Sequence, residues 1–143
     1  MRKANDQDAG MAMIDEPTIK SVVFRFYARV RKDPMLNEIF NAQVRDWEFH
    51  LQRMCEFWSS IILGHGRYKG HPFLKHVTLP ADARHFDRWL ELFAVTVRET
   101  CTPAAAELML KRATLIARSL EGGIANAHGV VLGRDQRFEA DRL

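Results

Sequence analysis

The sequence predicts an all-α protein, and three observations support that prediction. Apolar residues recur at spacings of three and four along four long stretches of the chain, which is the period of an amphipathic helix. No stretch alternates apolar and polar residues in the manner of a half-buried strand, and no internal repeat is visible. Prolines and glycines separate the periodic stretches, where they end one helix before the next begins.

The first long helix is predicted to begin at Thr18 and to end near Asp33. Pro34 disfavours helical geometry at the residue before it. A short turn should follow, with apolar anchors that include Phe40. The apolar residues of this helix recur at helical spacing: Ile19, Val22, Val23, Phe26 and Val30.

The second long helix is predicted from Val44 to Leu63, with Asp46 placed favourably toward the positive end of its dipole. One face of it combines a histidine with large apolar side chains: His50, Met54, Phe57, Trp58 and Ile61. The glycines that follow predict a loop from Gly64 to Pro72, with one helical turn over residues 73–76.

The third helix is predicted to begin near Asp82, and the fourth at Pro103 with Thr102 as its cap. Gly122-Gly123 should weaken the end of the fourth helix. The buried stripe of the third helix contains Phe86, Trp89, Leu90, Phe93 and Val97.

The composition indicates one folded domain. The chain has 143 residues, of which 47% are hydrophobic, enough for a core that encloses a small cofactor. We expect a flexible N-terminal tail over residues 1–16, a folded domain over 17–128 and a C-terminal tail over 129–143. Cys55 and Cys101 lie within apolar helical patterns, as reduced core cysteines do, which favours the cytoplasm. A net charge of +3, spread along helices, argues against a nucleic-acid partner, and no apolar run is long enough to span a membrane.

Three residues are candidates for a site. His76 follows the glycine-rich loop beside apolar residues, so its imidazole could ligate haem iron, although a histidine at the edge of the core would look the same. Tyr27 and Trp89 lie within helices and each carries a polar atom that needs a partner when buried. Both could equally be core residues with an incidental hydrogen bond.

Four motifs occur in order along the chain: FYARVRKDPMLNEIFN from Phe26, DWEFH from Asp46, FWSSIILGHGRYKGHPFLKH from Phe57 and HFDRWLELF from His85. Together they resemble the truncated haemoglobins, and within them the third group, over about residues 18–120. The resemblance implies a truncated globin, in which a two-over-two helical sandwich encloses haem b (iron protoporphyrin IX).

The resemblance also implies roles for individual residues. His76 matches the proximal iron ligand, and Tyr27, His50 and Trp89 match residues of the distal pocket, where ligands bind. Further residues are expected to contact the haem, either as pocket walls or, for the tyrosine and lysine, beside a propionate: Phe40, Met54, Phe57, Trp58, Tyr68, Lys75 and Phe93.

The implied function is reversible binding of dioxygen, NO or CO. Hydrogen-bond donors beside the ligand should slow its release, which suits oxygen sensing, scavenging or chemistry better than bulk delivery. NO dioxygenase or peroxidase-like turnover stays open, and it would need an external reductase because no flavin or nicotinamide domain is recognisable.

Two alternatives come from other classes of protein. The first is a helical zinc protein with His65, His71, His76 and His85 as ligands, whose spacings match no zinc motif that we can state. The second is a cofactor-free helical interaction domain whose aromatic residues all belong to the core.

Overall fold

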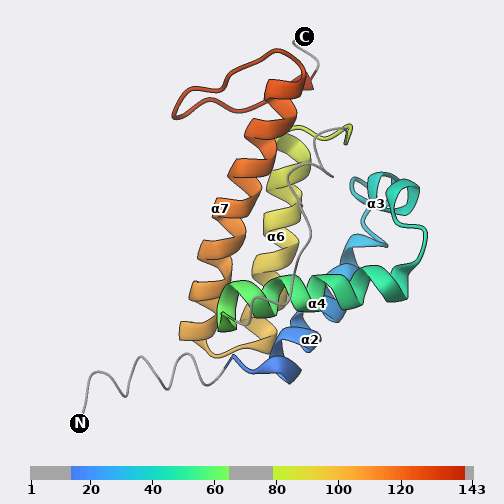
Figure 1. Ribbon diagram of the computed structural model, residues 1–143, viewed down its shortest axis with the longest axis vertical. Coiled ribbons are helices and arrows are strands. Elements are labelled where there is room, and N and C mark those ends of the chain that lie inside the picture. Colours follow the sequence, from blue (N-terminus) through green and yellow to red (C-terminus); the bar gives the residue numbers. More distant parts are fainter. Residues whose placement is uncertain (1–13, 65–78, 141–143) are drawn as a thin grey trace.

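The computed structural model describes residues 14–64 and 79–140 (Figure 1). Over these two ranges the chain forms five helices and no strand. The helices are α2 (Glu16–Val30), α3 (Asn37–Gln43), α4 (Trp47–Leu63), α6 (Ala83–Thr100) and α7 (Pro103–Ala127). Among the described residues, none of the helices combines the length and the apolar character that a membrane crossing requires.

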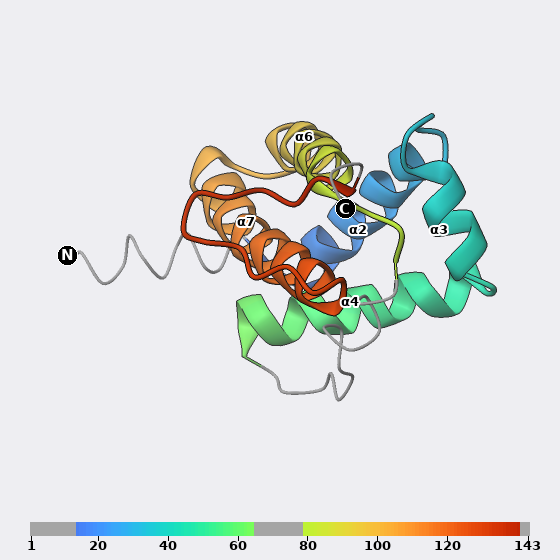
Figure 2. The same ribbon diagram turned by 90° about the horizontal axis from the view of Figure 1, so that it is seen from above.

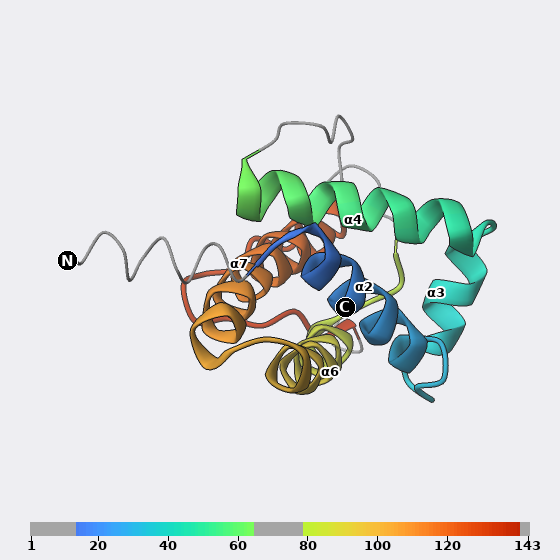
Figure 3. The ribbon, with the colours of Figure 1, turned by 90° about the horizontal axis from the view of Figure 1, so that it is seen from below.

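The helices pack in two pairs. α6 and α7 lie side by side, joined by a tight turn, and α2 packs against both α4 and α6 (Figure 2). Seen from below, α4 runs along one side of the molecule, α6 lies on the opposite side, and α2 lies between them (Figure 3). This arrangement is the two-over-two sandwich that the sequence predicts.

Local capping explains where the helices begin. The Asp15 carboxylate accepts hydrogen bonds from the Thr18 backbone N–H at 3.0 Å and from the Thr18 hydroxyl at 2.7 Å, so α2 begins at Glu16, two residues before the predicted start. Asp46 caps α4 by accepting from the Phe49 N–H at 3.1 Å, which moves the start of that helix from the predicted Val44 to Trp47.

The predicted starts of the last two long helices are confirmed. Asp82 caps α6, and Thr102 caps α7 with Pro103 in its first turn. α7 continues through Gly122 and Gly123, which were expected to weaken its end, and stops at Ala127. The helical cost of a glycine, about 1 kcal/mol, is small beside the packing of this end of α7 against the C-terminal segment.

The C-terminal segment Val130–Ala140, expected to be part of a polar tail, folds back onto α6 and α7. Phe138 is buried, and its carbonyl accepts from the Ala83 N–H at 2.8 Å. Arg137 bridges the buried Glu121 carboxylate, at 3.0 Å, and Asp87, at 2.8 Å. Composition alone suggests that the charged residues of this segment are exposed to solvent. In the structure, Arg137 instead forms ion pairs with residues of α6 and α7.

We expect Arg137→Ala to lower the free energy of unfolding by about 3 kcal/mol, because the substitution leaves the buried Glu121 without its main counter-ion. The control is Arg118→Ala. Arg118 is half-exposed and lies 3.4 Å from the same carboxylate, so its loss should cost less than about 1 kcal/mol. Urea unfolding of the three proteins makes the comparison, and equal losses in the two variants would show that the segment contributes nothing specific.

Candidate functional site

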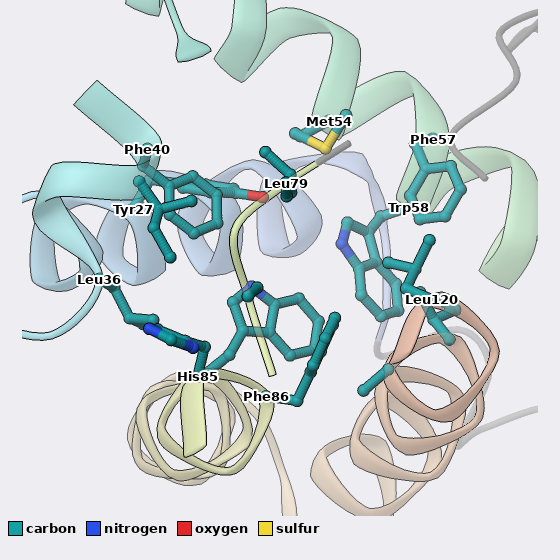
Figure 4. Close-up of a pocket in the computed structure, with 15 residues that line it drawn as sticks. Tyr27, Leu36, Phe40, Met54, Phe57, Trp58, Leu79, His85, Phe86 and Leu120 are labelled. Carbon is teal, nitrogen blue, oxygen red and sulfur yellow. The ribbon is translucent and has the colours of Figure 1, made fainter. Parts of the chain in front are cut away.

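A cavity lies between α2, α3 and α4 on one side and α6 and α7 on the other (Figure 4). The space between its walls is about 790 Å³ with its wide opening to solvent included. Its lining is almost entirely apolar and rich in aromatic rings: Tyr27, Leu36, Ile39, Phe40, Met54, Phe57, Trp58, Leu79, Ala81, His85, Phe86, Trp89, Ile116, Ala117 and Leu120.

Tyr27 brings a hydroxyl group into this apolar space. Its ring is 6% exposed, and its oxygen projects across the cavity toward Leu79 (Figure 4). Burial raises the pKa of the Tyr27 phenol well above its usual value of 10.0. The hydroxyl therefore keeps its proton at physiological pH and is available as a hydrogen-bond donor.

Trp89 contributes to the cavity from α6 and is held by a stack of aromatic rings. Its ring stacks on Phe93 with centroids 5.6 Å apart and planes at 7°, and Phe93 stacks in turn on Trp58 at 5.1 Å. The edge-to-face contact of Phe26 with Trp89, at 5.3 Å, closes the group on the α2 side. Trp89 is therefore fixed in orientation by its neighbours.

The Tyr27 hydroxyl and the Trp89 indole N–H make no hydrogen bond to any residue within 14–64 or 79–140. Both residues line the same apolar cavity, which is open to solvent. A polar ligand bound there could accept the hydrogen bonds that these two groups do not make within the described protein.

The structure brings most of the expected pocket residues together. Phe40, from α3, and Met54, Phe57 and Trp58, from α4, all line the cavity. Two of the expected residues lie elsewhere. Phe93 is buried behind Trp58 and Trp89, outside the lining. His50 packs edge-on against the Tyr27 ring at 5.0 Å, and it too is outside the lining.

The predicted iron ligand His76, together with Tyr68 and Lys75, lies outside the described residues, as do His65 and His71 of the zinc alternative. In the part of the chain that the structure describes, no three His, Cys, Asp or Glu side chains are close enough to share a metal ion.

His85 lines the cavity, and the sequence assigned it a role only as a ligand in the zinc alternative. Its Nδ1 accepts a hydrogen bond from the Asp82 backbone N–H at 3.0 Å, while the Asp82 carboxylate caps the same turn. A neutral imidazole with Nδ1 accepting carries its proton on Nε2. The spacing of three residues between Asp82 and His85 is that of a capping box, and this spacing could have shown from the sequence that His85 is held at the start of α6.

Asp33 fixes the wall of the cavity next to α3. Its carboxylate accepts from the Met35 and Leu36 N–H groups, both at 3.1 Å, and from Arg88 Nε at 2.7 Å. Burial is the largest influence on the Asp33 carboxyl and raises its pKa, but these hydrogen bonds outweigh burial, so the pKa lies below its usual value. The ionised carboxylate thus ties Leu36, in the lining, to the residue that precedes Trp89.

The cavity fits haem in its chemistry. A large planar apolar group matches walls of aromatic and aliphatic side chains, and the Tyr27 hydroxyl and the Trp89 indole on the lining match a polar ligand on its iron. The residues that would hold it are the lining side chains of α4, α6 and α7.

Comparison with known proteins agrees with this geometry. The model of a family described as bacterial-like globin matches residues 12–120. A group 3 truncated hemoglobin of Campylobacter jejuni is 33% identical over 109 residues, which cover 73% of this chain and 86% of that protein.

Crystal structures of two hemoglobins superpose on the chain. The group III truncated hemoglobin from C. jejuni does so with a TM-score of 0.70 at 33% identity, covering 76% of this chain and 89% of that one. The hemoglobin from Chloroflexus aurantiacus gives 0.65 at 25% identity, covering 76% and 92%.

Proposed function

The chain belongs to the bacterial-like globin family as a group III truncated haemoglobin, and from that premise we propose that it retains dioxygen tightly through donors from Tyr27 and Trp89. As a truncated haemoglobin it is a haem-binding globin that takes up diatomic gas ligands. The predictions of an all-α truncated globin and of haem b as cofactor are thereby confirmed.

The observation that carries the proposal is the pair of donors in the cavity. Haem supplies an iron whose sixth position takes a diatomic ligand. Hydrogen bonds to a charged acceptor contribute roughly 1.5–3 kcal/mol, which corresponds to about one to two orders of magnitude in ligand release. The Tyr27 hydroxyl keeps its proton, and stacking on Phe93 restricts the orientation of the Trp89 ring.

His76 is the residue that would hold the iron. Its support is its place in the motif GRYKGHPFLKH, which follows α4 in the sequence. A neutral imidazole nitrogen is the usual proximal ligand in globins.

Tight retention favours oxygen sensing, scavenging or chemistry on oxygen over bulk delivery, since delivery needs ready release. Any turnover, whether of nitric oxide or of peroxide, draws electrons from a separate reductase in this proposal. We further propose that the protein acts in the cytoplasm, without a nucleic-acid or membrane partner, on the basis of its reduced core cysteines and spread charge.

Oxygen release from the reduced, haem-reconstituted protein tests the proposal. Stopped-flow mixing of the oxygenated protein with excess CO measures the dissociation rate, and the matched comparison is the double variant Tyr27→Phe/Trp89→Phe. We expect the wild-type protein to release oxygen at least about tenfold more slowly than this variant. Equal rates in the two proteins would contradict the proposal.

A further inference from the structure

Four side chains meet where the end of α2 crosses the start of α4. Tyr27 and Arg31 are four residues apart at the end of α2, and Trp47 and His50 are three residues apart in the first turn of α4. These spacings place each pair on one face of its helix. The two faces meet because α2 packs against α4.

The three rings of this group are in mutual contact. The Trp47 ring meets the His50 ring at 5.4 Å and 86°, the His50 ring meets Tyr27 at 5.0 Å and 85°, and Trp47 lies 6.0 Å from Tyr27. The Arg31 guanidinium lies 4.4 Å from the centroid of the Trp47 ring, within the range of a cation–π contact. The cation at the C-cap of α2 thus contacts Trp47, and Trp47 contacts two of the three residues expected in the distal pocket, Tyr27 and His50.

His50 lies next to the cavity on α4, so the contacts of its ring determine whether the imidazole stays outside the cavity. Met54 follows His50 by four residues, so the two share a face of the helix, and Met54 lines the cavity while His50 does not. A different side-chain rotamer of His50 would therefore point its imidazole along the face that borders the cavity. Edge-to-face contacts with two rings favour the rotamer that is observed.

We propose that Trp47, with Arg31 against its ring, is a positioning residue that holds His50 against Tyr27 and outside the ligand cavity. The inference rests on the proposed function, because it concerns access to the same cavity. Loss of the Trp47 ring removes one of the edge-to-face contacts that favour this rotamer, so the imidazole would more often occupy the cavity and compete with external ligands for the iron.

The test compares Trp47→Leu with Phe49→Leu, a matched control in the same turn of α4 whose aromatic ring is 60% exposed. In the reduced, haem-reconstituted proteins we expect Trp47→Leu to slow CO association by roughly 2- to 10-fold. Its deoxy spectrum should also gain a six-coordinate, low-spin component. The control should match the wild type in both measurements.

Two further variants separate positioning from general loss of structure. In a His50→Ala background, Trp47→Leu should change neither the CO rate nor the spectrum, because no imidazole is left to enter the cavity. Arg31→Met, which keeps an apolar stem over the ring but removes the cation, should shift both measurements in the same direction by a smaller factor. It also provides the test if Trp47→Leu does not fold.

The inference is overturned if Trp47→Leu behaves like Phe49→Leu, or if its effect persists without His50. Failure of the proposed function gives a different result. The wild-type protein would then release oxygen as fast as Tyr27→Phe/Trp89→Phe, while the effect of Trp47→Leu on CO association would still depend on the presence of His50.

Discussion

A His76→Ala variant will retain little or no haem under conditions in which the wild-type chain takes up one haem per molecule. The apolar cavity can bury the porphyrin in either protein, but only a proximal imidazole bonds the iron and fixes the plane of the ring. Haem transfer to an excess of a stronger haem-binding acceptor protein, followed through the Soret band, measures the difference in retention.

Two controls make this result specific to coordination. His65→Ala and His71→Ala remove histidines from the same glycine-rich sequence and should leave haem retention at the wild-type level. Added imidazole should restore coordination in His76→Ala, because the free ligand supplies the nitrogen that the variant lacks. A His76→Ala protein with the wild-type spectrum and rate of haem loss would show that another residue holds the iron.

Tyr27→Phe should raise the oxygen dissociation rate by about one to two orders of magnitude, which is the factor that corresponds to roughly 1.5–3 kcal/mol for a hydrogen bond to a charged acceptor. The substitution removes one oxygen atom and keeps the ring that packs against Phe26, Phe40 and His50. Trp89→Phe should act in the same direction. Stopped-flow oxygen release from the reduced, reconstituted proteins provides the rates.

The control for Tyr27→Phe is Ser59→Ala, which also deletes a hydroxyl from a buried residue but does so away from the cavity. Ser59 donates to Glu16 at 2.6 Å, so its loss should lower stability and leave the oxygen rate unchanged. A Tyr27→Phe variant that is destabilised without faster oxygen release would mean that the hydroxyl faces no ligand.

Elements determined by local chemistry could be predicted from the sequence. The starts of α6 and α7 follow from Asp82 and from Thr102-Pro103, because a cap acts within one turn of the chain. The stability of the end of α7, which holds its helical form past Gly122-Gly123 to Ala127, could not be predicted in this way. It depends on the C-terminal segment, whose Arg137 reaches Glu121 across 16 residues of sequence.

The same distinction, between local sequence patterns and the packing of separate helices, applies to the residues of the candidate site. Helical spacing placed Met54, Phe57 and Trp58 on one face of α4, and all three line the cavity. Spacing along one helix could not show that Phe93 lies behind the two tryptophans, because that depends on where α4 lies relative to α6. The contact of Trp47 with His50 and Tyr27 likewise arises only from the crossing of α2 and α4.

The central claim is that the described cavity, completed by His76, is a haem pocket. Spectrophotometric titration of the purified apoprotein with haem tests it most directly, with thermal unfolding followed in the same samples. We predict a Soret band that saturates at one haem per chain, together with a rise in the unfolding temperature, as expected for a ligand that binds the native state. A titration that yields no Soret band and no thermal shift would contradict the claim.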